Sequence, residues 1–261
     1  MHGFARELPS QAICLVLGVP ETDQPALLDW LDAGIEEDSP SILTADTMRR
    51  IRAYAVDLIA DKRAHPDDGI MSTIVHARDA DGIGLSDEEL IAFFALLFPA
   101  GSETTRSALA GAVDAFADHP AELTRLGADP TLVPTAIEEI VRWTTPSVYK
   151  RRTASRAVTL AEVPIAAGDK VTFWEMSANR DERVFADPFR FDVTRPITPT
   201  QVGFGAGGPH FCLGANLARR EITVMFDELR RRVPDLRITG EPAYLESFFI
   251  NGIKRLPCAW D

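Results

Sequence analysis

Cysteine is scarce in this 261-residue chain, which contains only Cys14, Cys212 and Cys258. Three scattered cysteines are too few for a disulfide framework, and no CxxC pair predicts a zinc site. An odd number of cysteines is typical of the reducing cytosol, so we expect a cytoplasmic protein. The cysteine content therefore excludes small disulfide-stabilised scaffolds and common zinc modules.

Basic residues and long apolar runs are also in short supply. The chain has 27 Lys and Arg against 39 Asp and Glu, which gives a formal net charge of -12 and argues against general nucleic-acid binding. No apolar run is long enough to span a bilayer, and residues 1–7 lack the apolar centre of a signal peptide. With 46% hydrophobic residues and no repeats, the sequence predicts a single domain over residues 1–261.

What the first half does have is helical periodicity. Helices are predicted at about 8–17, 22–34, 44–64, 67–78, 86–118, 120–127 and 134–143. The helix at 8–17 is apolar on most sides, so we expect it to be buried almost completely, under a cover that lies outside this chain.

The helix predicted at 86–118 begins with a capping box, Ser86 with Glu89. Its middle breaks the helical rules, because Pro99 removes a backbone donor and four polar residues occupy positions 102–105. Together they predict a kink at a functional site. Alternatively, Thr104 and Thr105 only bond back to preceding carbonyls and bend the helix.

The second half alternates short strands with irregular chain. Strands are predicted at 158–160, 163–165 and 170–174, irregular chain at 175–203, and a hairpin between 248–250 and Ile253 turned by Asn251-Gly252. The predicted fold class is therefore mainly α with small antiparallel β-sheets (α+β).

One loop, residues 204–214 with the sequence FGAGGPHFCLG, combines three glycines with Cys212. Glycines let a backbone pass close to a flat or bulky group, and a helix is predicted to start at Leu213. A cysteine at the head of a helix faces the positive end of the helix dipole, which favours the thiolate. The pattern predicts a soft metal held by one sulfur; the alternative is an inert packed cysteine.

Four signatures in this order resemble the cytochrome P-450 family of haem-thiolate monooxygenases. They are 100–105 (AGSETT) in the long helix, Glu139-x-x-Arg142, the stretch from Asp187-Pro188 to Phe191-x-x-x-Arg195, and the Cys212 loop. The resemblance covers essentially the whole chain and is closest to soluble bacterial members, especially actinobacterial ones that act on steroids or branched lipids.

The resemblance implies haem b (iron protoporphyrin IX) with Cys212 as its axial thiolate. Further residues implied to bind the cofactor are His210 and Arg152 at the propionates and Phe204, Gly205, Gly208 and Gly214 in the loop. Phe204 lies eight residues before Cys212, one more than the commonest spacing in the family.

The remaining implied roles concern proton delivery, support of the loop and the substrate. Glu103 and Thr104 match the acid–alcohol pair that delivers protons during oxygen activation. Glu139, Arg142 and Arg195 match a buried structural triad behind the cysteine loop. The implied substrate pocket contains Leu97, Ala100, Ser147, Val148, Phe249 and Ile250, and its apolar character indicates a hydrophobic substrate.

The expected reaction inserts one oxygen atom from O₂ into an apolar substrate such as a steroid or lipid. Electrons would come from NAD(P)H through a reductase and a ferredoxin, which the basic runs Arg219-Arg220 and 230–232 could receive. Family members carry a longer N-terminal part, with several helices and a sheet. We therefore expect a C-terminal portion of the fold, with a missing N-terminal segment as a further partner.

Two other functions remain open at this stage. The chain could be a truncated non-catalytic remnant that binds haem weakly or not at all. More remotely, Cys212 and His210 could act as a cysteine hydrolase, although no orienting Asp or Asn is evident.

Overall fold

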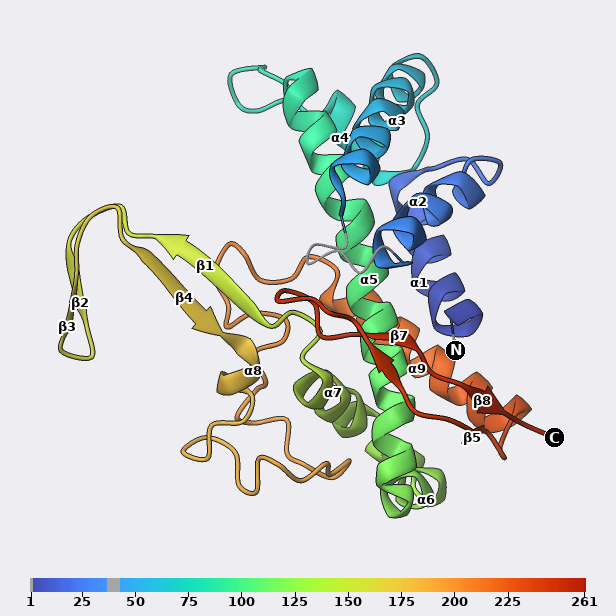
Figure 1. The fold of residues 1–261 in the computed structure, drawn as a ribbon. Helices are drawn as coiled ribbons and strands as arrows, with labels where there is room; N and C mark the ends of the chain where they lie inside the picture. Colours follow the sequence, from blue (N-terminus) through green and yellow to red (C-terminus); the bar gives the residue numbers. More distant parts are fainter. Residues whose placement is uncertain (1, 37–42) are drawn as a thin grey trace.

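The computed structural model describes residues 2–36 and 43–261 (Figure 1). Its helices are α1 (His2–Leu17), α2 (Gln24–Glu36), α3 (Ala45–Ala64), α4 (Ile70–His76), α5 (Asp87–Asp118), α6 (Pro120–Ala128), the short 3₁₀ helix η1 (Pro130–Leu132), α7 (Val133–Thr144), α8 (Glu175–Ala178) and α9 (Ala215–Arg232). Its strands are β1 (Tyr149–Thr153), β2 (Val158–Leu160), β3 (Val163–Ile165), β4 (Lys170–Trp174), β5 (Arg237–Ile238), β6 (Ala243–Tyr244), β7 (Ile253–Arg255) and β8 (Cys258–Ala259).

Helix α5 runs through the middle of the molecule (Figure 1). The predicted capping box is confirmed, with Glu89 N–H donating to Ser86 Oγ at 3.3 Å and Ser86 N–H to Glu89 Oε2 at 2.8 Å. The helix continues unbroken through Pro99 to Asp118, so the proline does not end it. Helices α1–α4 surround its first half, and α6, α7 and α9 lie along its second half.

The cover expected for the first helix is α5 itself, so the prediction that it lies outside the chain is wrong. Ile13, Cys14 and Leu17 are buried, and Cβ atoms on α5 would be crowded here: one added at Gly101 would lie 2.6 Å from Ile13 Cγ1. Leu15 on the opposite side is 76% exposed, so α1 is amphipathic rather than buried all round. The helix also begins earlier than predicted, at His2, and accommodates Pro9.

Two hydrophobic clusters share α5. One joins its first half to α1–α4 and includes Leu27, Ile51 and Phe94. The other joins its second half to α7, α9 and the C-terminal strands and includes Leu109 and Ile140. Because one helix supplies side chains to both clusters, it fixes the two halves relative to each other.

The strands form four two-stranded antiparallel ribbons. In the longest, Lys150 of β1 lies opposite Phe173 of β4; the β2–β3 hairpin continues this ribbon and projects from the body (Figure 1). The predicted fold class, mainly α with small antiparallel sheets, is confirmed. No described helix has the length and apolarity needed to cross a membrane.

The predicted hairpin at 248–253 is wrong in its partner. Strand β7 pairs with β6, so residues 245–252 form the connection between them. Residues 249–251 pair instead with the segment before β1: Val148 N–H donates to Phe249 O and Asn251 N–H to Pro146 O, both at 2.9 Å. The turn residues were read correctly as a reversal, but a distant segment supplies the hydrogen bonds.

Three helix boundaries also differ from the predictions. Helix α4 covers only Ile70–His76 of the predicted 67–78. The helix after the cysteine begins at Ala215 rather than Leu213, so Cys212 lies in the loop and not in the first helical turn. In the predicted irregular segment 175–203, α8 forms one short turn.

Candidate functional site

The loop before α9 presents Cys212 at the surface. Cys212 N–H donates to Phe204 O at 2.9 Å, which closes the loop into a ring. Gly205, Gly207 and Gly208 all have positive φ between 79° and 94°, a conformation that favours glycine. The Cys212 side chain is exposed, and a Cβ on Gly207 or Gly208 would meet nothing within 4 Å. The loop therefore offers its sulfur beside open backbone.

The balance of forces on the Cys212 thiol differs from the prediction of a favoured thiolate. The loop backbone removes water from the sulfur, which raises the pKa of Cys212. The Gly214 N–H and the positive charges of Arg219 and Lys150 oppose this rise without overcoming it. The helix dipole is too distant because α9 starts three residues later. A bound metal would have to displace the thiol proton.

Helix α7 supports the loop through Glu138, a residue that the sequence prediction did not single out. The Arg219 guanidinium of α9 donates to both Glu138 oxygens, and its centre lies 4.5 Å from the centroid of the Phe204 ring. Gln201 Nε2 donates to the same carboxylate at 3.0 Å. Because Phe204 O accepts from Cys212, this contact fixes the loop from behind.

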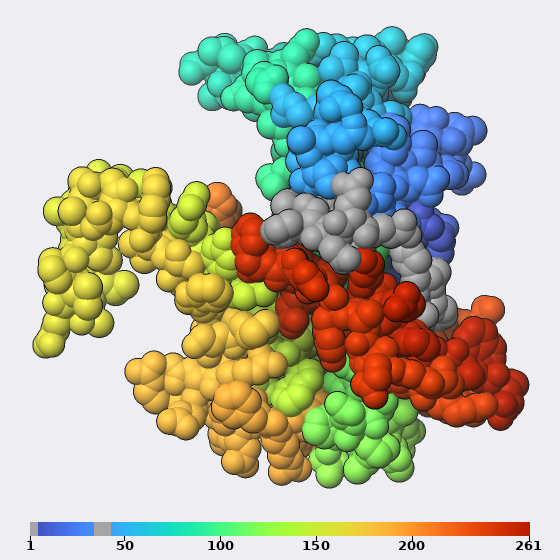
Figure 2. All heavy atoms as spheres, in the orientation of Figure 1, coloured from blue at the N-terminus to red at the C-terminus, as the bar shows by residue number. Residues whose placement is uncertain are grey.

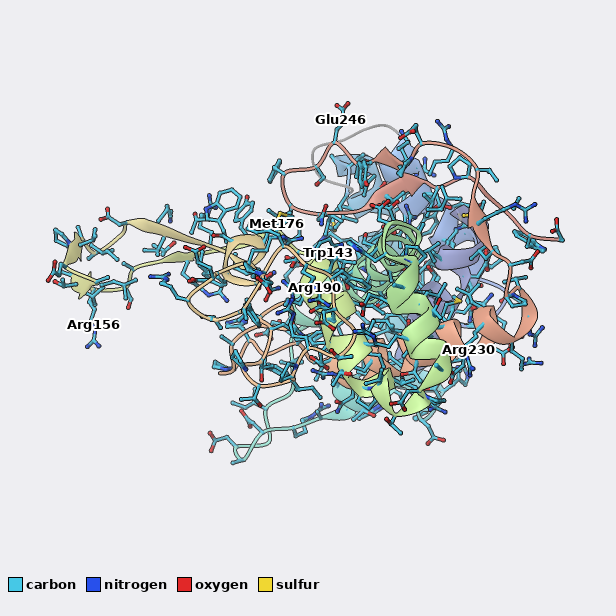
Figure 3. All side chains as sticks on the ribbon, turned by 90° about the horizontal axis from the view of Figure 1, so that it is seen from below. Trp143, Arg156, Met176, Arg190, Arg230 and Glu246 are labelled. Atoms are coloured by element: carbon cyan, nitrogen blue, oxygen red, sulfur yellow. The ribbon has the colours of Figure 1, made fainter. Side chains whose placement is uncertain are left out.

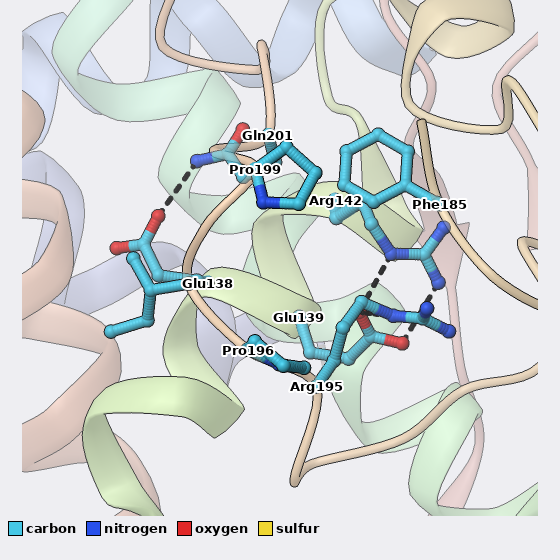
Figure 4. Close-up of a pocket in the computed structure, with 9 residues that line it drawn as sticks. Glu138, Glu139, Arg142, Phe185, Arg195, Pro196, Pro199 and Gln201 are labelled. Atoms are coloured by element: carbon cyan, nitrogen blue, oxygen red, sulfur yellow. Dashed lines mark hydrogen bonds and ion pairs between the residues drawn. The ribbon is translucent and has the colours of Figure 1, made fainter. Parts of the chain in front are cut away.

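The next residue, Glu139, joins Arg142 and Arg195, so the structure brings the predicted triad together (Figure 4). Arg142 Nε lies 2.6 Å and Arg195 Nε 2.9 Å from Glu139 Oε2, and the Glu139 and Arg142 side chains are only 0–1% exposed. Their remaining donors bind backbone carbonyls of the irregular segment, at residues 179, 186–188 and 190. Two arginines thus shape a segment that has almost no secondary structure.

A small cavity beside the triad has no room for a substrate. Its lining includes Glu139, Arg142, Phe185 and Pro199 (Figure 4), and its volume is about 10 Å³. A volume of this size holds roughly one water molecule. The substrate site must therefore be sought elsewhere.

The polar residues in the middle of α5 point in different directions. Glu103 is 3% exposed and lies 3.6 Å from Arg106 Nη1, which also reaches Asp32 Oδ1 at 3.3 Å. Burial raises the pKa of Glu103, and Arg106 opposes the rise. Thr104 is half-buried and its hydroxyl donates to Ala100 O at 2.9 Å. The back-bonding considered from the sequence is therefore present at Thr104, and no described hydrogen bond joins Glu103 to Thr104.

The residues predicted to line the pocket fall into two groups. Leu97 and Ala100 lie on α5, where Ala100 is exposed and Leu97 half-buried. Ser147, Val148, Phe249 and Ile250 form a second wall, held by a bridge between Ser147 and Ile250 and by the Val148–Phe249 hydrogen bond. In Figure 2 the molecule is hollowed beside α5, between the helices of the first half and the β1–β4 ribbon.

The ribbon carries both the predicted Arg152 and an unpredicted ion pair. Lys150 Nζ lies 3.0 Å from Glu175 Oε2, and Glu175 is 2% exposed at the start of α8. Lys150 also donates to Ser147 Oγ. Arg152 is exposed and its guanidinium lies 5.9 Å from the Phe173 ring centroid. His210 is exposed in the cysteine loop.

No group of three or more His, Cys, Asp or Glu side chains in the described residues is arranged to hold a metal ion. A metal at Cys212 would therefore take a single sulfur from this chain and its other ligands from a cofactor.

Comparison with known proteins identifies the family. The sequence model of the family Cytochrome P450 matches residues 128–232. A Bacillus megaterium cytochrome P450 solved with testosterone has 34% identity and a TM-score of 0.87, over 98% of this chain and 71% of that one. A Mycobacterium marinum cytochrome P450 solved with pseudoionone has 37% identity and a TM-score of 0.90, over 98% of this chain and 63% of that one.

The chain belongs to the cytochrome P450 family. A methyl-branched lipid omega-hydroxylase of Mycobacterium bovis is 47% identical over 98% of this chain, and a steroid C26-monooxygenase of Mycobacterium tuberculosis is 39% identical over 95%. The chain spans 61% of the first of these relatives and 57% of the second. The predicted resemblance to bacterial members is confirmed, and the fold corresponds to part of the cytochrome P450 fold.

The residues of this P450 fit a haem. A flat cofactor needs an exposed soft ligand, backbone without side chains beside it and apolar surface around it. Cys212 is the exposed sulfur, and the loop glycines leave its surroundings open. Phe211 is 45% and Leu213 74% exposed on either side of the cysteine, which gives the apolar contact.

The sequence prediction missed Glu138, Gln201, Lys150 and Glu175. Glu138 and Gln201 carried no signal beyond ordinary helix and loop polarity. Lys150 carried one: it is a lysine two residues before Arg152, in a strand next to the predicted pocket, and alternate strand residues share a face.

Proposed function

We propose that the chain is the thiolate-bearing part of a haem monooxygenase that inserts one oxygen atom from O₂ into an apolar substrate. The observation that carries the proposal is the exposed Cys212 in a glycine-rich loop that α7 and α9 support from behind. When bound, the haem supplies oxygen activation at its iron. The chain's own residues bind it, orient it and control protons around it.

Cys212 would be the axial ligand, and the Gly214 N–H that already bonds the sulfur would stabilise the thiolate. Arg152 and His210 would receive the propionates, since both side chains are exposed and Arg152 meets no carboxylate among the described residues. Phe204, Gly205 and Gly208 would keep the loop backbone clear of the ring.

Thr104 and Glu103 would control protons on the other side of the cofactor. The Thr104 hydroxyl can accept a proton-bearing water while it donates to Ala100 O. Glu103 Oε2 is buried without a hydrogen-bond partner, so it can accept or release a proton if its side chain turns from Arg106. The helix brings both groups within one turn, as proton transfer requires.

The substrate class follows from the two pocket walls. Leu97, Val148 and Phe249 are apolar and at least partly exposed, which favours an apolar molecule. The names of the lipid hydroxylase and steroid monooxygenase relatives support the same class. We therefore propose a steroid, lipid or other apolar small molecule as substrate.

The haem assignment is tested by the absorption spectrum of the reduced, CO-bound protein. We expect a Soret band at the position typical of thiolate-ligated haem, and Cys212→Ala should abolish it. Cys258→Ala is the matched control, because Cys258 is half-buried in β8 and should not affect the band. A band that survives Cys212→Ala would refute the ligand assignment, and no haem uptake by the unmodified chain would favour the non-catalytic alternative.

We propose that a ferredoxin, reduced by NAD(P)H through its reductase, docks near Cys212 at Arg220. The predicted basic run is smaller than expected, because Arg219 is engaged with Glu138 and cannot turn outward freely. Arg231 and Arg232 pair with Glu228 at the far end of α9, where Figure 3 shows Arg230. Arg220 remains exposed close to the loop.

This docking site predicts a charge effect that calorimetry with a ferredoxin can measure. Arg220→Glu should weaken ferredoxin binding by about tenfold at low salt, since it reverses a steering charge. Arg156→Glu on the projecting hairpin, well away from α9 in Figure 3, is the control for general charge. Equal effects of the two substitutions would contradict docking at Arg220.

A further inference from the structure

Lys150 sits where the sequence predicted only apolar and hydroxyl side chains. Its Nζ donates to Ser147 Oγ and lies 5.7 Å from the centroid of the Phe249 ring. Both Ser147 and Phe249 belong to the predicted pocket wall. A cation thus lies against that wall, and 34% of its side chain is exposed.

The ammonium is held in place but not used up. Glu175, 2% exposed, lies 3.0 Å from it, so a buried carboxylate fixes its position. An ammonium has three donors, and the described hydrogen bonds of Lys150, to Ser147 and Glu175, occupy two. The third donor is left for a ligand.

The charge on this side of the ribbon is positive. Strand alternation puts Lys150 and Arg152 on one face of β1, opposite Phe173 and Val171 of β4. Glu175 is the one carboxylate that acts on this pair in the described contacts, so two positive charges face one negative charge. Lys170 of β4 lies opposite Thr153 and bonds its hydroxyl, away from this group.

We propose that Lys150 binds a carboxylate group carried by the molecule in this pocket. The pocket would then select an apolar molecule that ends in a carboxylate, with its chain along the walls and its charge at Lys150. The inference rests on the proposed function for the identity of the pocket. The carboxylate belongs either to the substrate or to a haem propionate, and both sources offer the same chemistry to the ammonium.

The test for a substrate carboxylate compares dodecanoate with dodecanol, which has the same chain without the charge, by calorimetry on the haem-loaded chain. Lys150→Met should weaken dodecanoate binding by about tenfold or more, because it removes a charge-assisted hydrogen bond. Dodecanol binding should not change. Glu175→Gln should act in the opposite direction and tighten dodecanoate, because it removes the competing carboxylate.

The test for a propionate compares haem with haem dimethyl ester in binding to the haem-free chain. If Lys150→Met weakens haem and not the diester, the carboxylate belongs to the cofactor; if it weakens only dodecanoate, the carboxylate belongs to the substrate. Either result supports carboxylate binding by Lys150. Unchanged affinity for both carboxylates, or equal losses for dodecanoate and dodecanol, overturns it.

Two further variants guard against a folding effect. Lys150→Met leaves Glu175 buried without its partner, so Lys150→Met/Glu175→Gln, which removes both charges, should show the same dodecanoate loss with normal circular dichroism. Lys170→Met on the neighbouring strand should bind both probes like the unmodified chain. Because binding is measured without turnover, failure here leaves the CO spectrum, and hence the proposed function, unaffected.

Discussion

Glu221 is a carboxyl group whose burial makes the stability of the fold depend on pH. It lies on α9, is 5% exposed, and its Oε2 has no hydrogen-bond partner. Loss of water raises the pKa of Glu221 to about 7. The folded chain therefore holds the proton more tightly than the unfolded chain. The stabilisation is complete below the ordinary pKa of Glu, roughly 4.3, and is lost as pH rises to 7.

Glu221→Gln should remove this dependence, because the amide stays neutral. We expect the variant to gain stability relative to the unmodified chain between pH 5 and pH 8, by up to about 3 kcal/mol. Urea unfolding at both pH values measures the gain. Glu228→Gln, on the exposed face of the same helix, is the control and should leave the pH slope in place. An unchanged slope in Glu221→Gln would show that Glu221 ionises without cost.

At the residue scale, the sequence predicted which side chains matter better than where they point. Glu103 and Thr104 were predicted from their position in the apolar helix, and both lie at its centre. Their directions follow from the helical turn of about 100° per residue together with the packing of α1 and α2. Only the fold shows that Glu103 faces Arg106 while Thr104 faces the open side.

At the scale of elements, Gly101 permits the close crossing of α1 and α5. A Cβ here would lie 2.6 Å from Ile13 Cγ1 and 2.7 Å from its Cδ1. Gly101→Val should therefore lower the free energy of unfolding by about 1–3 kcal/mol through overpacking. Adding Ile13→Ala should cost less than the sum of the two single changes, which a double-mutant cycle by urea unfolding would detect.

Gly127 in α6 gives the matched control for this crossing. A Cβ on Gly127 meets nothing within 4 Å, so Gly127→Ala should leave stability unchanged or raise it by about 0.5 kcal/mol. A loss in Gly127→Ala as large as that in Gly101→Val would mean that helix propensity, and not the crossing, determines the effect.

The elements themselves were largely predictable where periodicity and caps were strong. The capping box at Ser86 and the cap at Thr44 set two helix starts correctly. The β6–β7 pairing was not predictable, because the strand partner depended on a segment about a hundred residues away that engages residues 249–251. Likewise, no local signal revealed that Arg142 and Arg195 bind the carbonyls of the irregular segment.

At the scale of the whole molecule, α5 couples the two hydrophobic clusters. Leu90 in one cluster and Leu109 in the other are 0% and 1% exposed. Truncation of either to Ala should cost about 2–5 kcal/mol. Because α5 belongs to both clusters, we expect one cooperative transition, which would support the prediction of a single domain over residues 1–261.

Tryptophan fluorescence can test this coupling, since Trp30 packs against the first cluster and Trp143 against the second. In variants that retain only one of the two, with the remaining tryptophans replaced by Phe, the urea midpoints should coincide. Leu90→Ala should shift the midpoint at Trp143 as well as at Trp30. Separate midpoints would show that the two halves unfold independently.

By itself, the sequence determined the helices, the family and the identity of Cys212 as the central residue, because periodicity, caps and motif spacing are local properties. The tertiary structure decided what surrounds that residue. It placed Glu138 and Arg219 behind the loop, raised rather than lowered the pKa of the thiol, and brought Lys150 to the pocket wall. Burial, charge balance and contact between distant segments arise only when the chain packs.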